Sequence, residues 1–134
     1  MMTAEEKYEY WLDIAEYDLE SAETMFKGHR WLYVTFMCQQ ALEKLVKGLY
    51  ILYVDDNVPR LHDITKLLER FEDKLPVSVP PDKYSLFDKL SLYYLSNRYP
   101  EYISKLSSQV KESVADTILV ETKEAFAWLL TLKP

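Results

Sequence analysis

The chain has 134 residues, 49% of them hydrophobic, with 11 Tyr, 5 Phe and 3 Trp, which excludes an intrinsically disordered segment and predicts one domain over residues 1–134. Only 2 glycines are present, so the Gly-rich loop that cradles phosphate groups in many nucleotide-binding proteins is excluded. The net charge of −6 argues against broad, nonspecific binding of nucleic acid.

The first predicted helix starts at Thr3, because Thr3 and Glu6 have the spacing of a capping box. We expect it to end at Gly28 through a left-handed glycine. The N-terminal run Met1–Lys7 lacks the basic start and apolar run of a signal peptide, and no apolar stretch is long enough for a membrane span. We therefore expect a cytoplasmic protein with no membrane contact. The residues predicted to face inward are Tyr8, Leu12, Ala15, Leu19, Ala22 and Phe26.

The second predicted helix, from about Arg30 to Val54, runs antiparallel to the first because the link between them is short. A polar stripe on it is formed by Gln40, Lys44 and Lys47, which are four and three residues apart. Two interpretations stay open: a solvated face with an ion pair between Glu43 and Lys47, or a helix that presents hydrogen-bond donors to a ligand. Its apolar stripe consists of Trp31, Val34, Cys38, Leu42, Leu45, Leu49 and Leu52, with Cys38 as a small buried thiol.

The second half of the chain is also predicted to be helical. A turn over residues 55–59 separates the second helix from a third, and a proline-rich connection separates the third from a fourth. Pro100 disfavours helix at Tyr99, and a polar segment follows to about Glu112. The predicted helices are Leu61–Leu75, Asp82–Asn97 and Ser113–Leu132. The fold class is therefore all-α, an up-and-down bundle of four to five helices.

Three pieces of sequence, in this order and at these intervals, resemble the HEPN domain, named for higher eukaryotes and prokaryotes nucleotide-binding. They are Gln39–Lys47, the run Leu61-His62-Asp63-Ile64, and the run Asn97-Arg98-Tyr99-Pro100. The segment Trp11–Ala22 is similar to the first helix of that family, so the resemblance covers roughly residues 8 to 130. The resemblance implies a helical bundle that forms a homodimer and is often encoded beside a minimal nucleotidyltransferase.

Many members of that family are RNases or RNase-like toxins whose dimer juxtaposes two Arg…His motifs. Arg98 matches the Arg of the motif, but Tyr99 follows it, and positions 103 to 105 hold Ile103, Ser104 and Lys105 where the family has its His. No histidine follows His62, and an arginine does not transfer protons at neutral pH. The resemblance therefore predicts a binding module, the partner of a minimal nucleotidyltransferase in a toxin–antitoxin-like pair. The alternative is a metal-independent RNase that uses Arg98 with an atypical partner.

For a nucleotide or RNA ligand, the expected contacts are positive charge from Arg98, Lys44 and Lys47 and hydrogen bonds from Asn97 and Gln40. Arg98 has an equally weighted second interpretation, as a cap of the helix that it ends. His62 and Asp63 are expected to hold the turn before the third helix. No catalytic residue, metal or cofactor is predicted.

Homodimerisation is expected because a single bundle of this size has difficulty hiding its 11 Tyr, 5 Phe and 3 Trp residues. The fourth predicted helix, with Tyr93 and Tyr94, is expected near the twofold axis, as the family arrangement implies.

Overall fold

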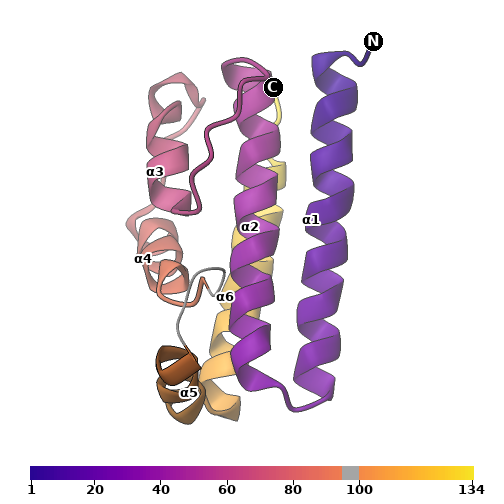
Figure 1. The fold of residues 1–134 in the computed structure, drawn as a ribbon. Coiled ribbons are helices and arrows are strands. Elements are labelled where there is room, and N and C mark those ends of the chain that lie inside the picture. The colour runs from indigo at the N-terminus through magenta and orange to yellow at the C-terminus, as the bar shows by residue number, and fades with distance from the viewer. Residues whose placement is uncertain (95–99) are drawn as a thin grey trace.

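The computed structural model describes residues 1–94 and 100–134, and every regular element in these two ranges is helical (Figure 1). The predicted all-α class is therefore confirmed. The elements are α1 (Ala4–Lys27), α2 (Trp31–Tyr53), α3 (Ile64–Glu69), a short 3-10 helix η1 (Glu72–Lys74), α4 (Pro81–Ser91), α5 (Pro100–Gln109) and α6 (Glu112–Leu130).

α2 is the central helix of the bundle. It contacts α1 on one side and α3 and α4 on the other, and α6 packs behind it in the view of Figure 1. The predicted apolar stripe explains this position, because its middle residues are fully buried. Those with no exposed surface are Val34, Cys38, Leu42, Leu45 and Leu49, whereas Trp31 and Leu52 are half-buried.

α1 begins at the predicted capping box. The backbone N–H of Glu6 donates to Thr3 Oγ1 at 3.1 Å, and the N–H of Thr3 donates to Glu6 Oε1 at 3.0 Å. α1 lies so close to α2 that a Cβ on Gly48 would stand 3.1 Å from Trp11 Cβ and 3.2 Å from Tyr8 Cδ2. The absence of a side chain at Gly48 therefore sets the distance between the two helices.

The prediction that Gly28 takes the left-handed conformation is wrong. Its φ is −87°, and His29 instead has a φ of 59°. The N–H of His29 donates to the carbonyl of Phe26, and the N–H of Arg30 donates to that of Met25, which is the hydrogen-bond pattern of a Schellman motif. Histidine is among the residues that tolerate this region, and the His29 ring stacks on Trp31 at 5.1 Å.

Three predicted boundaries also differ from the structure. The third predicted helix is divided into α3 and η1, and α4 ends at Ser91, so that Leu92, Tyr93 and Tyr94 follow the helix. A helix, α5, occupies the segment predicted to be merely polar. Pro100 starts α5, where a missing N–H costs nothing, and Ile103, Leu106 and Val110 have the three-and-four spacing of a buried face.

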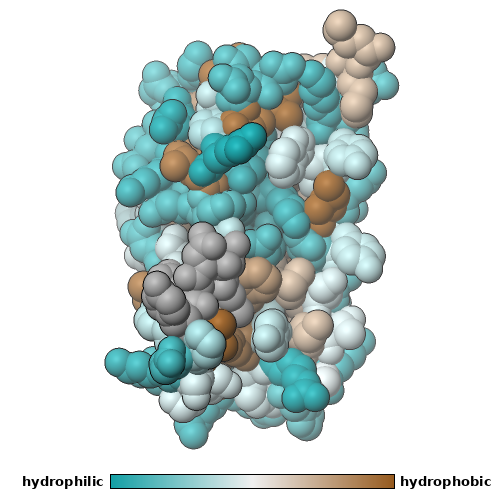
Figure 2. All heavy atoms as spheres, in the orientation of Figure 1, coloured by the Kyte–Doolittle hydropathy of each residue, from teal (hydrophilic) through white to brown (hydrophobic). Residues whose placement is uncertain are grey.

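Within the two described ranges, no helix combines the length and the apolar character needed to cross a membrane. Figure 2 shows a mainly hydrophilic face with several separate hydrophobic patches. Aromatic side chains with large exposed fractions are Tyr17 (70%), Tyr10 (63%) and Tyr33 (48%).

Candidate functional site

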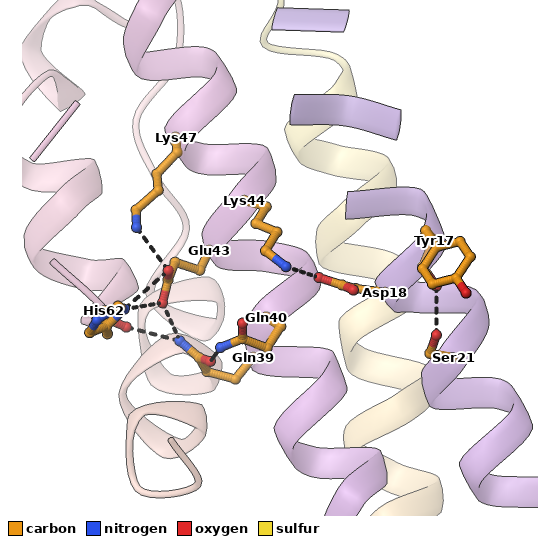
Figure 3. A network of polar contacts seen from close by, with 9 residues as sticks. All are labelled: Tyr17, Asp18, Ser21, Gln39, Gln40, Glu43, Lys44, Lys47 and His62. Atoms are coloured by element: carbon orange, nitrogen blue, oxygen red, sulfur yellow. Dashed lines mark hydrogen bonds and ion pairs between the residues drawn. The ribbon is translucent and has the colours of Figure 1, made fainter. Parts of the chain in front are cut away.

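Among the residues that the structure describes, the polar network with the most contacts is centred on the carboxylate of Glu43, which is only 3% exposed (Figure 3). Lys47 Nζ lies 2.9 Å from Glu43 Oε2, and Gln39 Nε2 donates to Glu43 Oε1 at 2.8 Å. Gln39, Glu43 and Lys47 are each four residues apart on α2, so their side chains lie one above the other along one face. The buried charge of Glu43 is thereby neutralised and hydrogen-bonded, as burial requires.

His62 completes this network from the segment that precedes α3. Its Nδ1 atom lies 3.2 Å from both carboxylate oxygens of Glu43, and its backbone carbonyl accepts a hydrogen bond from Gln39 Nε2 at 2.9 Å. The imidazole ring also stacks on Tyr94, with 4.2 Å between ring centroids and 16° between planes. Backbone, ring edge and ring face of His62 are thus each held by a different residue.

Asp63 continues the segment by capping α3. Its Oδ1 atom accepts a hydrogen bond from the backbone N–H of Lys66 at 3.1 Å. The two residues of the His62–Asp63 pair therefore have separate contacts, one to α2 and one to α3.

The predicted polar stripe of α2 does not converge on one point. Lys44 Nζ pairs with Asp18 Oδ2 of α1 at 2.6 Å, whereas Lys47 pairs with Glu43 on another side of α2 (Figure 3). Gln40 Nε2 donates to Gln39 Oε1 at 2.7 Å and so joins the Glu43 network. Asn97 and Arg98 lie outside the described residues.

The interpretation of this stripe as a solvated face is wrong in one respect. The ion pair between Glu43 and Lys47 forms, but both residues are buried, with exposed fractions of 3% and 8%. The reason is that α3, α4 and α5 all pack against α2, and this packing covers a face that helical spacing alone describes as polar. Sequence reasoning also missed Gln39 and Tyr94 as members of the network. The signal for Gln39 was its four-residue spacing to Glu43 and then to Lys47.

The described part of the chain offers neither a reactive thiol nor a set of metal ligands. Cys38 is fully buried, and burial raises the pKa of its thiol to about 12, so it is not a nucleophile at neutral pH. No cluster of three or more His, Cys, Asp or Glu side chains suited to a metal ion occurs among the residues that the structure describes.

A pocket of about 710 Å³ separates the α1–α2 turn from α5. His29 and Arg30 line it from the turn, and Ile103 and Ser104 line it from α5. Ile103 and Ser104 stand at two of the positions where the Arg…His motif would place its histidine, so this wall of the pocket carries an apolar group and a hydroxyl instead.

Comparison with known proteins agrees with the fold. The HEPN domain matches residues 8–132 of the chain. The crystal structure of TT1696 from Thermus thermophilus is similar, with a TM-score of 0.79 and 24% sequence identity over 93% of this chain and 97% of that one. The structure of ST0689, an archaeal HEPN homologue, is similar with a TM-score of 0.73 and 24% identity over 96% of this chain and 98% of that one. No curated protein is significantly similar to the sequence.

Proposed function

The chain belongs to the HEPN domain family, and we propose that it acts as a binding module, the partner of a minimal nucleotidyltransferase in a toxin–antitoxin-like pair, with a nucleotide or RNA as ligand. One observation favours binding over catalysis. The positions of the motif histidine carry Ile103, Ser104 and Lys105, which lie on α5. None of these side chains supplies the proton transfer that metal-independent RNA cleavage needs at neutral pH.

Incubation of the purified protein with tRNA and mRNA tests this choice. We expect the RNA to remain intact over hours, as it does in buffer alone. Cleavage that disappears in Arg98→Ala but persists in Arg70→Ala would instead establish the alternative, an RNase with an atypical partner for Arg98. Arg70 is the matched control because it is an exposed arginine at the end of α3.

For the protein partner, the supporting feature is the charge of the chain. A net charge of −6 suits a complementary protein surface better than naked nucleic acid. A minimal nucleotidyltransferase encoded beside this chain is the partner to test, by mixing the two purified proteins and following their elution together on gel filtration. Independent elution at concentrations well above a micromolar would remove this part of the proposal.

For the ligand, the ion pairs on α2 leave Arg98 as the residue expected to contribute most to affinity. The ammonium groups of Lys44 and Lys47 already pair with Asp18 and Glu43, so Arg98 is the main source of positive charge for a phosphate group. Asn97 and Gln40 are proposed to add hydrogen bonds. Titration calorimetry with ATP should show binding that weakens by about 1.5–3 kcal/mol in Arg98→Ala. Unchanged affinity in that variant would leave Arg98 as a helix cap.

We also propose that the chain forms a homodimer with the end of α4 near the twofold axis. Leu92, directly after α4, is 56% exposed, and Tyr102 on α5 is 36% exposed, and exposed apolar side chains of this size support an interface in this half of the chain. Light scattering should give twice the chain mass of 15.9 kDa. A monomer mass at every concentration would contradict the dimer.

A further inference from the structure

The tautomer of His62 is fixed by its neighbour. A carboxylate has only acceptors, so the Nδ1 atom that faces both oxygens of Glu43 at 3.2 Å must carry a proton and donate it. In the neutral imidazole the other nitrogen, Nε2, is then a bare acceptor. The carboxylate of Glu43 is itself held by Lys47 and Gln39, so it is not free to turn away from His62.

The Nε2 atom has no hydrogen-bond partner among the residues that the structure describes, and the His62 side chain is 47% exposed. Its direction is nevertheless set, because Glu43 holds the opposite edge of the ring and Tyr94 covers one face. An acceptor that is held in place before a ligand arrives costs little conformational entropy to use. Such an exposed and oriented acceptor is the arrangement of a ligand contact.

The charges around His62 define which group it accepts from. Among the residues that the structure describes, the charge of Glu43 is neutralised by Lys47 and the carboxylate of Asp63 accepts from the start of α3, so neither residue gives His62 a net charge that would attract an anion. A bare nitrogen acceptor also repels a phosphate oxygen. The complementary group is a neutral donor, and the donor that all ribonucleotides share and deoxyribonucleotides lack is the 2′-hydroxyl.

We propose that His62 Nε2 accepts a hydrogen bond from the ribose 2′-hydroxyl of the bound nucleotide and so makes the site prefer ribonucleotides to deoxyribonucleotides. This inference rests on the nucleotide or RNA binding proposed above. Glu43 is a positioning residue in it, since it acts through His62 and does not touch the ligand.

The test compares ATP with 2′-deoxy-ATP, and a single-stranded oligoribonucleotide with the DNA of the same sequence, by calorimetric titration. A neutral hydrogen bond predicts that wild type binds each ribo-ligand about threefold to tenfold more tightly than its deoxy counterpart. His62→Phe keeps a ring to stack on Tyr94 but lacks the acceptor, so its affinity for ribo-ligands should fall to that for deoxy-ligands. His29→Asn is the matched control, because it removes the other histidine and asparagine tolerates the φ of 59° there. It should keep the preference.

The titrations distinguish a failure of the His62 assignment from a failure of nucleotide binding. Equal affinity of wild type for ribo- and deoxy-ligands, or a preference that survives in His62→Phe, overturns the assignment of His62 while leaving nucleotide binding intact. If neither ATP nor the oligoribonucleotide binds, the proposed ligand binding fails, and this inference fails with it.

Nitrogen-15 NMR of the wild-type protein tests the assignment without a substitution, which keeps it falsifiable if His62→Phe does not fold. We expect one imidazole with a protonated Nδ1 and a bare Nε2, whose Nε2 resonance moves on addition of ATP and moves much less with 2′-deoxy-ATP. A ring protonated on Nε2 alone, or identical shifts with the two nucleotides, would contradict the proposal.

Discussion

The two sides of α2 are both buried, but they are built from different chemistry. Toward α1 the contact is close and mainly apolar, with Gly48 lying against Trp11 and Tyr8. Toward the segment before α3 the contact is polar, with Gln39 and Glu43 bonded to His62. Apolar packing is non-directional and stabilises any arrangement that excludes water. A buried carboxylate, in contrast, is stable only if each of its hydrogen-bond donors is in place. The first side therefore supplies stability, and the second fixes the position of one residue.

The largest effect that separates the two sides is expected from Glu43→Leu. This change leaves the Lys47 ammonium, which is only 8% exposed, without its carboxylate, and should lower the free energy of unfolding by about 3–5 kcal/mol. Urea denaturation followed by circular dichroism measures it. The double variant Glu43→Leu/Lys47→Met should recover most of the loss, because two apolar side chains replace the pair. A double variant no more stable than Glu43→Leu would show that packing, and not the unpaired charge, causes the loss.

On the α1 side, Gly48→Leu should cost about 3 kcal/mol, since even a Cβ there would stand 3.1 Å from Trp11 Cβ. Ordinarily a larger residue in a helix interior is favoured over glycine. The sign of the change in the free energy of unfolding therefore tests the close approach of the two helices. The rate at which a thiol reagent labels Cys38 is a sensitive measure, because this thiol is fully buried, with its pKa raised by burial to about 12, and reacts after unfolding. Faster labelling is expected in the variant. Labelling as slow as in wild type would refute the clash.

The second ion pair of α2 gives a smaller effect. Lys44→Met removes the partner of Asp18, which is 6% exposed, but the Lys44 side chain is 24% exposed and so water reaches this pair. We expect a loss of about 2 kcal/mol in the free energy of unfolding, less than for Glu43→Leu. The same urea titration serves for both variants. An equal or larger loss here would show that access of water does not make the Lys44–Asp18 pair weaker than the Glu43–Lys47 pair.

The smallest effect is expected at the start of α1, where the capping box is exposed. Thr3→Ala should cost about 1 kcal/mol at neutral pH. The hydrogen bond from the Thr3 backbone N–H lowers the pKa of Glu6 below 4.5, so the contribution of Glu6 is present above that pH and is lost as the pH falls through the lowered value. Thermal unfolding of wild type and of Glu6→Ala at several pH values should therefore show the difference between these two proteins narrowing as the pH falls below 4.5. A constant difference would mean that the ionised carboxylate of Glu6 contributes nothing.

The fold was predictable where short-range rules decide it. The capping box at Thr3 and the spacing of Val34, Cys38 and Leu42 act within one helix, so they are legible in the sequence. α5 was missed because its serines and lysine are typical of a polar connection, although Ile103 and Leu106 carry the helical spacing. The left-handed conformation was predicted at Gly28 but occurs at His29, because histidine also tolerates a positive φ.

Of the candidate site, the sequence supplied the residue types but not their partners. The family resemblance identified His62 and the Gln39–Lys47 run, and the residue spacing predicted an ion pair between Glu43 and Lys47. Whether that pair is solvated or buried depends on which elements pack against α2, and no spacing within α2 contains that information.

The sequence by itself determined that this chain is a helical bundle, since periodicity and capping are properties of neighbouring residues, and its motifs gave the resemblance to the HEPN family. Only the tertiary structure decided that Lys44 pairs with Asp18, 26 residues away, and that Glu43 contacts His62, 19 residues away. The physical reason is that a charged side chain on a helix can pair only with groups on the element that packs against its face of the helix. That neighbour is fixed by the packing of the whole core.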